Sequence, residues 1–211
     1  MENNRFIQQH DNCMNNVIVE NYFVGVKTMN ILDLADMLLS LDEKKELQTS
    51  KKLLEQSNYF AFYEGNQNII KSILFRETLE EFLDFSKENS LDKECYCAAF
   101  LCAHGYGIQI GGYEDDLTHT LTEFFHTQGM EYPEISEIVC KEKIYTDCSD
   151  YDNFKKTMTA INQELDTHGM RLVVLEDFVY CDCEYTVLKL DKALADKMLS
   201  SWSSDNFEIY L

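Results

Sequence analysis

One arrangement recurs three times in the second half of this sequence: an amphipathic stretch, a glycine, and then a short apolar or alternating run. The three copies are centred on Gly105, Gly129 and Gly169. Glycine accepts the left-handed backbone conformation that ends many helices, because it has no Cβ to clash. We therefore expect a helix to end at each glycine, and two of the three helices to lead directly into a strand. Such units build a domain of helices and sheet.

The clearest strand-like segments lie in this second half. Arg171–Leu175 is a largely apolar run, typical of a strand covered on both faces, and Glu184–Leu190 follows it after a short acidic segment. That connection is too short for a crossover helix, so we expect the two strands to pair antiparallel. Three more segments predict strands, the last of them at an edge: Tyr106–Gly111, Glu137–Tyr145 and Asn206–Tyr210. Helices separate only some of these strands, which predicts an α+β fold with a mixed β-sheet and helices packed on it.

Helical periodicity is strongest after Ser149–Asp150, where four apolar side chains share one face: Phe154, Met158, Ile161 and Leu165. Residues 1–91 form a mostly helical N-terminal part, with helices expected over Ile31–Leu41, Glu43–Ser57 and Asn68–Lys87. The aromatic run Tyr59–Tyr63 fits either a strand or a plug in the core.

Composition favours a single globular domain over residues 1–211, made of the helical part and a part of alternating helices and strands over residues 92–211. One proline and 8 glycines leave little material for a linker. The N-terminus has no signal-peptide pattern, so we expect a cytoplasmic protein. In that compartment the 8 cysteines are expected to be reduced thiols.

Charge is the most informative functional property of the chain. It carries 38 acidic and 18 basic side chains, a formal net charge of −20. The excess is uneven, with a balance of −6 over residues 1–91 and −14 over residues 92–211. Such a surface repels nucleic acid and anionic membrane and attracts basic proteins. Alternatively, the acidity serves only to keep the protein soluble.

No motif for catalysis or for a cofactor is present, so we expect a protein that is not an enzyme. Two Cys-x-Cys pairs, Cys95–Cys97 and Cys181–Cys183, resemble halves of a zinc site, but they lack the usual ligand spacing. His119, Glu123 and His126 share one helical face without matching a known two-histidine motif. We expect neither metal nor cofactor, although the sequence leaves open whether the two cysteine pairs converge.

The segment Ile161–Leu199 combines a helix, a corner at residues 168–172 (HGMRL), an apolar strand, an acidic turn, a second strand and a closing helix. In this pattern it resembles an uncharacterised bacterial family of small domains of the polymorphic-toxin immunity-protein type. Cys181 and Cys183 depart from the small polar residues of the family's turn. The resemblance covers about a fifth of the chain and carries no catalytic residues over.

Together these features predict a non-enzymatic, acidic, cytoplasmic protein-binding module, most concretely an immunity protein that neutralises a basic toxin domain by occlusion. Two alternatives remain: an acidic nucleic-acid mimic that inhibits a DNA-binding protein, and an enzyme or metal-binding protein whose site is assembled only in three dimensions. We expect the partner to contact three acidic groups, the last of which includes two aromatic anchors: Glu114, Asp115 and Asp116; Asp147, Asp150 and Asp152; and Glu176, Asp177, Phe178, Tyr180, Asp182 and Glu184.

Overall fold

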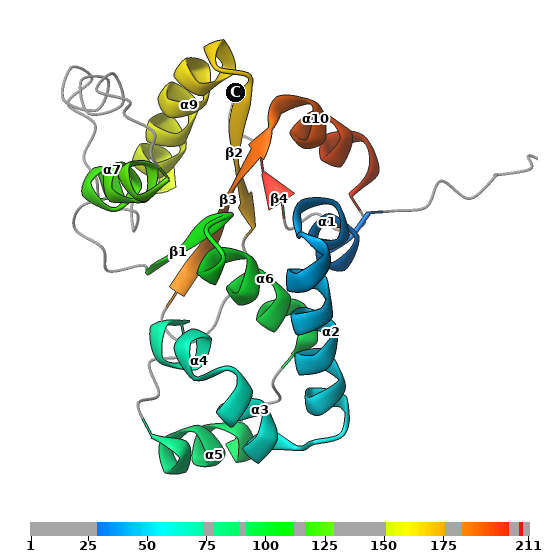
Figure 1. The fold of residues 1–211 in the computed structure, drawn as a ribbon. Coiled ribbons are helices and arrows are strands. Elements are labelled where there is room, and N and C mark those ends of the chain that lie inside the picture. The colour runs from blue at the N-terminus through cyan, green and yellow to red at the C-terminus, as the bar shows by residue number, and fades with distance from the viewer. Residues whose placement is uncertain are drawn as a thin grey trace, which may run out of the picture.

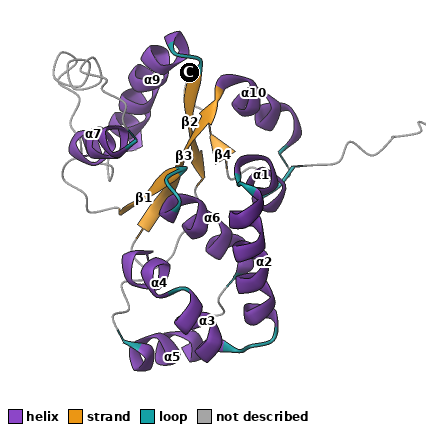
Figure 2. Cartoon of the chain, in the orientation of Figure 1, coloured by secondary structure: helices purple, strands orange, loops and turns teal. Residues whose placement is uncertain are grey.

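Four strands form one sheet in a computed structural model of the chain, which describes residues 29–73, 78–88, 92–111, 117–128, 151–175, 183–202 and 207–208. The strands are β1 (Gly107–Gly111), β2 (Met170–Leu175), β3 (Cys183–Asp191) and β4 (Phe207–Glu208), in the spatial order β1-β3-β2-β4. Helices pack on both sides of this sheet (Figures 1 and 2). The α+β class expected from the sequence is confirmed.

All pairings between the described strands are antiparallel. The predicted pairing of β2 with β3 is confirmed, with Val173 opposite Leu188. The predicted edge strand is also present, as β4 beside β2. The expectation of a mixed sheet was wrong for these strands. The helix-containing connections join strands of the same direction, β1 to β2 and β3 to β4, but another strand lies between the members of each pair, so all neighbouring strands are antiparallel. The further strand expected over Glu137–Tyr145 lies outside the described residues.

Side chains of β2 alternate between two separate cores. Leu172 and Val174 face α7 (Leu117–Thr127) and α9 (Tyr151–Thr167) on one side of the sheet. Val173 and Leu175 face the other core, which contains residues of α10 (Lys192–Ser201) and of the N-terminal helices. All four side chains are fully buried, as predicted for a strand covered on both faces.

The helix α9 supports the first of these cores with the face predicted from its periodicity. Phe154, Met158, Ile161 and Leu165 are each at most 1% exposed. Their spacing places them one above the other along the helix, so a single stripe covers the sheet. Phe124 and Phe125 of α7 complete this layer.

The described residues of the N-terminal part, 29–73 and 78–88, are mostly helical, as expected, but their helices divide differently from the prediction, and α6 follows in the second part of the chain. The helices with their bounds are α1 (Ile31–Leu38), α2 (Leu41–Glu55), α3 (Tyr59–Gly65), α4 (Gln67–Ile73), α5 (Leu79–Glu88) and α6 (Lys93–Ala103). The aromatic run after Asn58 is helical, and it buries Phe62 and Tyr63 as core plugs.

The prediction of a single long helix over Asn68–Lys87 was wrong, because the chain forms α4 and α5 there. A capping box begins α5: the Thr78 hydroxyl accepts a hydrogen bond from the Glu81 amide (3.2 Å), and the Glu81 carboxylate accepts one from the Thr78 amide (3.1 Å). These bonds satisfy amides at the start of a new helix. The Thr-x-x-Glu spacing was therefore a start signal inside an otherwise continuous helical pattern.

Two of the three glycines end helices in the way the sequence predicts. Gly105 follows α6 with φ +83°, and Gly169 follows α9 with φ +71°. Each leads into a strand within two residues. Gly129 lies outside the described residues. The helices that the structure describes include none that is long and apolar enough to cross a membrane.

Candidate functional site

The three predicted acidic groups fall on parts of the chain that the structure does not describe in full. Glu184 belongs to β3 and Asp152 to α9, but their side chains are not described. The remaining ten residues lie outside the described ranges. Their neighbours in sequence are placed: residues 176–182 connect the paired strands β2 and β3, and α7 and α9 begin directly after residues 116 and 150.

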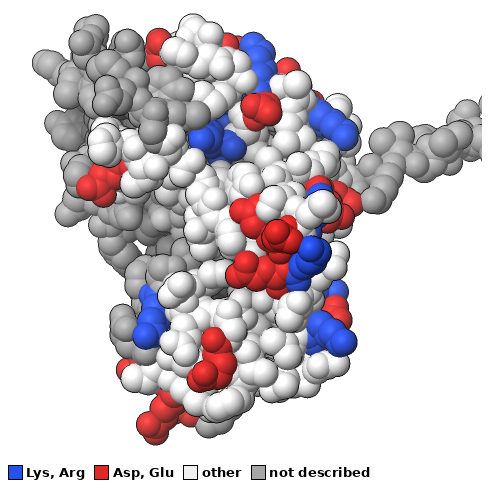
Figure 3. Space-filling model, viewed as in Figure 1, with Lys and Arg blue, Asp and Glu red and all other residues white. Residues whose placement is uncertain are grey.

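A second acidic region, which the sequence did not single out, lies at the start of α2. Figure 3 shows acidic side chains gathered in the middle of the viewed face, where Figure 1 has the beginning of this helix. Its first turns carry Asp42, Glu43 and Glu46. Lys45 pairs with Asp42 (2.8 Å) on the fully solvated side. The other two carboxylates turn towards the end of α6.

His104, the residue that ends α6, lies between these two carboxylates. Its Nδ1 is 3.2 Å from a Glu43 oxygen, and its Nε2 is 4.0 Å from a Glu46 oxygen. The ring stacks on Phe100 with centroids 4.2 Å apart, which fixes its plane. The histidine therefore links α6 to α2 and positions the carboxylates beside each other.

Glu43 is held by several hydrogen bonds at once. Its carboxylate accepts from the Ser40 amide (2.7 Å) in a capping box and from the Tyr106 hydroxyl (3.4 Å). The bonds to Ser40, aided by His104, hold the pKa of Glu43 below its usual value. Burial, together with the charge of Glu43, raises the pKa of Tyr106. Glu43 thus stays ionised and fixed, which suits electrostatic attraction better than proton transfer.

A surface cavity of about 350 Å³ opens on the other side of Glu46, at the junction of α3 and α4. We call it the α3–α4 cavity; it is lined by Glu46, Glu64, Gly65, Asn66, Gln67, Asn68 and Ile69. Two carboxylates and three side-chain amides make this lining strongly polar. Ile69 is its one aliphatic side chain and is 6% exposed.

The inner wall of the cavity is fixed by a buried polar group centred on Asn66, which is 4% exposed. Its Oδ1 accepts hydrogen bonds from the Ser50 hydroxyl (2.8 Å) and the Tyr96 hydroxyl (2.6 Å). Its Nδ2 donates to the Phe62 carbonyl (2.7 Å). These bonds tie α2, α3 and α6 together, and they hold the turn between α3 and α4 in place.

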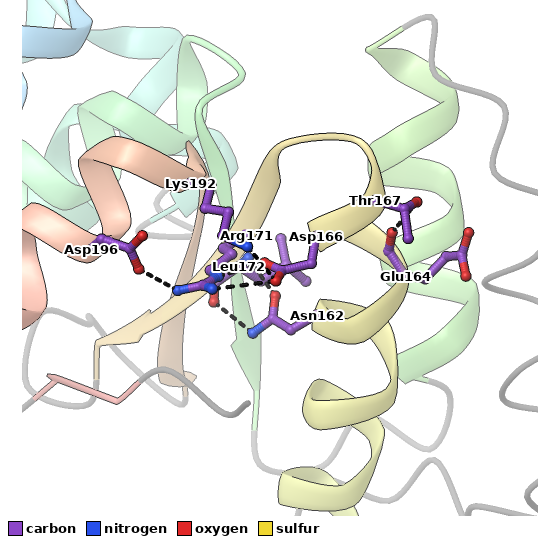
Figure 4. A network of polar contacts seen from close by, with 8 residues as sticks. All are labelled: Asn162, Glu164, Asp166, Thr167, Arg171, Leu172, Lys192 and Asp196. Carbon is purple, nitrogen blue, oxygen red and sulfur yellow. Dashed lines mark hydrogen bonds and ion pairs between the residues drawn. The ribbon is translucent and has the colours of Figure 1, made fainter.

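A second polar network, around Arg171, is structural. The guanidinium is 7% exposed and binds Asp166 of α9 through Nε (2.7 Å), while Asp196 of α10 accepts from Nη1. Lys192 also donates to Asp166 (2.6 Å). The hydrogen bonds from Arg171 and Lys192 lower the pKa of Asp166 to about 2. Figure 4 shows the network joining α9, the start of β2 and α10.

Beside this network, Asn162 of α9 closes a two-bond ring with the backbone of Leu172 (2.7 and 3.0 Å). The side chain is 1% exposed, and it fixes α9 against β2 (Figure 4). Every charge in the network has a partner, so the arrangement stabilises the helix–strand corner and offers no site for a ligand.

The cysteine and histidine patterns do not form a metal site in the described ranges. There, no three His, Cys, Asp or Glu side chains are arranged to hold a metal ion. Cys95, Cys97 and Cys102 are free thiols, and Cys97 is buried against the Ile31 carbonyl, away from Cys95. Glu123 and His126 are exposed on α7; Cys181, and the side chains of Cys183 and His119, are not described.

Sequence reasoning missed the α2–α3 region for an identifiable reason. If residues 59–65 are taken as a helix, Phe60 and Glu64 are four positions apart and share a face. If the same run is taken as a strand, the two side chains also lie on one side, but this interpretation gives no reason to expect an acidic residue of α2 beside them. The helix signal available was Asn58, whose side chain accepts from the Ala61 amide (3.3 Å).

In comparisons with known proteins, no protein-family model, no curated protein and no solved structure matches this chain.

Proposed function

We propose that this protein is a non-enzymatic binding module that recognises a basic protein, most concretely an immunity protein that neutralises a toxin domain by occlusion. The observation that carries the proposal is the charge of −20. On the face viewed in Figure 3, several carboxylates gather in the middle, with basic side chains beside them. The pattern of residues 161–199, which resembles immunity-type small domains, supports the same function.

The physics of such a module divides into two steps. Long-range attraction between the acidic surface and a Lys- and Arg-rich partner speeds encounter, and it weakens as salt screens the charges. Aromatic side chains that become buried in the interface then slow dissociation. The predicted hairpin segment 176–184 supplies both kinds of residue in Phe178, Tyr180 and four carboxylates. The protein blocks its partner by covering the partner's active surface, and no chemical step is needed.

The test is co-expression with the basic proteins that the neighbouring genes encode. The proposal expects one of them to stop growth when expressed alone, and growth to return when this chain is co-expressed. It also expects the two purified proteins to form a stoichiometric complex, measured by size-exclusion chromatography with light scattering.

A charge-matched pair of variants sharpens the result. Asp177→Lys with Asp182→Lys should weaken the protection, whereas Asp36→Lys with Glu80→Lys, at exposed positions on α1 and α5, should leave it intact. An equal loss of protection in both double variants would mean that protection depends only on the overall charge. If this protein instead binds only DNA-binding proteins, and does so in place of their DNA, the result would favour the nucleic-acid mimic.

A further inference from the structure

The α3–α4 cavity carries a more specific inference, which rests on the proposed function. Its two carboxylates come from different helices, Glu46 from α2 and Glu64 from α3, and both side chains are exposed. Within the part of the chain that the structure describes, the side chains of Glu64, Gln67 and Asn68 make no hydrogen bond or ion pair. The cavity therefore presents polar side chains that are available to a ligand.

The charge of the lining selects a cation. Two full negative charges flank the opening, while the first amides of α4 contribute at most about half a positive charge. An anion would meet a net repulsion from this lining, and a neutral ligand would gain nothing from the carboxylates. The attraction between opposite charges within about 4–6 Å is the strongest interaction that such a polar site can offer a ligand.

The number of acceptors favours a guanidinium over an ammonium. Glu46, Glu64, Gln67 and Asn68 line the cavity, and each of these side chains carries at least one acceptor oxygen. A guanidinium has five N–H donors in a plane and bridges carboxylates in a bidentate manner, whereas an ammonium acts as a point charge. A volume of about 350 Å³ also admits the long arginine stem.

An exposed aromatic residue lies about one helical turn from Glu64, a lining residue of the cavity. Phe60 is 59% exposed and is four residues before Glu64 on α3, so the two side chains are neighbours on one helical face. Exposed Phe next to carboxylates is typical of an interface anchor, because the ring loses contact with water when a partner covers it. Phe60 thus extends the site from a pocket for one side chain to a surface for a protein.

From these observations we propose that the α3–α4 cavity receives an arginine side chain of the basic partner, with Phe60 covered by the partner's backbone around that arginine. Glu46 and Glu64 bind the guanidinium, and the Asn66 group keeps the cavity open before the partner arrives. Preformed sites of this kind lose little conformational entropy on binding.

A titration with a small probe tests the cavity independently of the partner. The probe is N-acetyl-arginine methylamide, added to the ¹⁵N-labelled full-length chain and followed by amide chemical shifts. We expect saturable shifts centred on residues 64–69, with a Kd on the order of millimolar. The uncharged citrulline analogue should give no saturable shift there, and the lysine analogue should bind more weakly.

Isosteric variants give the decisive comparison. Glu46→Gln and Glu64→Gln should each weaken arginine binding about five- to tenfold. Glu80→Gln, which removes the same charge from exposed α5 outside the cavity, should change it less than about twofold. The proposal would be overturned if the citrulline or the lysine analogue bound with the same affinity as the arginine analogue. It would also be overturned if all three variants lost the same amount of affinity.

Failure of this inference is distinguishable from failure of the proposed function. If the partner binds Glu46→Gln, Glu64→Gln and Phe60→Ala with unchanged affinity, the interface lies elsewhere and the arginine site is wrong while the function stands. If no basic protein binds the chain, the function fails whatever the probe does. Circular dichroism of each variant verifies that it is folded, which is expected because the substituted side chains are exposed.

Discussion

At the residue scale, a few buried polar side chains fix the positions of the helices. Arg171 joins α9, β2 and α10, and Asn66 joins α2, α3 and α6. Neither residue was predicted as a structural centre, because periodicity identifies which faces are apolar but not which polar groups meet across them. Their partners are distant in sequence, as with Asp196 for Arg171 and Tyr96 for Asn66.

The first prediction concerns Asp166, whose side chain is 31% exposed. Asp166→Asn removes the charge that faces buried Arg171 and partly exposed Lys192, and we expect the free energy of unfolding at pH 7 to fall by about 2 kcal/mol. Glu164→Gln, which affects only the 3.7 Å pair with His168, should cost less than about 0.5 kcal/mol. Denaturant unfolding of the three proteins measures both values.

The same variant has a defined pH dependence. The folded pKa of Asp166, about 2, lies below the usual value of 3.8, so its ionised form stabilises the fold above pH 4. This contribution is lost as the pH falls from about 4 towards about 2. The stability difference between the parent protein and Asp166→Asn should therefore shrink below pH 4. A difference that stays constant from pH 7 to pH 3 would contradict the assigned network.

The second prediction concerns thiol reactivity. Burial raises the pKa of Cys97 to about 12, whereas Cys95 and Cys102 are partly exposed. At pH 8 the reactive thiolate of Cys97 is therefore scarce and shielded. Mass spectrometry after brief iodoacetamide treatment should find Cys97 unmodified in the native protein and modified in guanidinium chloride. Native modification of Cys97 at the rate of Cys95 would show that α6 packs differently.

At the scale of elements, the sequence predicted those that have strong local signals. The helix α9 has four apolar side chains in one stripe, and the β2–β3 pair has a short connection, so both were predicted within a few residues. Helix α3 was not, because a seven-residue segment with four aromatic side chains satisfies strand and helix patterns equally. The division of α4 from α5 depended on one capping box at Thr78, which periodicity does not detect.

The third prediction tests the contact between β1 and β3. A Cβ at Gly107 would lie 2.3 Å from the Val187 carbonyl oxygen, a backbone atom that cannot move without breaking the pairing. Gly107→Ala should therefore lower the free energy of unfolding by more than about 2 kcal/mol. Gly65→Ala is the control, because nothing lies within 4 Å of its added Cβ. Thermal unfolding should show a lower Tm for the first variant and an unchanged or slightly higher Tm for the second.

At the scale of the whole molecule, the sheet separates two cores, and helices cover both of its faces. The sequence predicted this architecture apart from the direction of some strands. The site was less predictable. The α3–α4 cavity depends on the meeting of α2 with the α3–α4 turn, and such contacts arise from tertiary packing that no local pattern encodes. The acidic hairpin segment remains a sequence-based prediction.

The fourth prediction follows from the net charge of −20. Raising the salt concentration from about 0.01 M to about 0.15 M shortens the screening length from about 30 Å to about 8 Å, which reduces repulsion among the carboxylates. Buried pairs such as Arg171–Asp166 are screened less. We expect the Tm to rise by about 2–4 °C, a stabilisation of about 1 kcal/mol. A fall in Tm would show that surface ion pairs outweigh the repulsion.

The central claim is that the acidity of this protein serves to bind a basic partner, and association kinetics test it most directly. The full-length chain and the basic protein encoded beside it are compared by surface plasmon resonance at about 50 mM and about 300 mM NaCl. We predict association at least tenfold slower at the higher salt concentration. Asp177→Lys with Asp182→Lys should slow association at low salt. Phe178→Ala or Tyr180→Ala should speed dissociation, with a loss of about 2 kcal/mol in binding free energy. Binding that ignores salt and all of these substitutions, or no binding at all, would contradict the claim and leave the charge as a source of solubility alone.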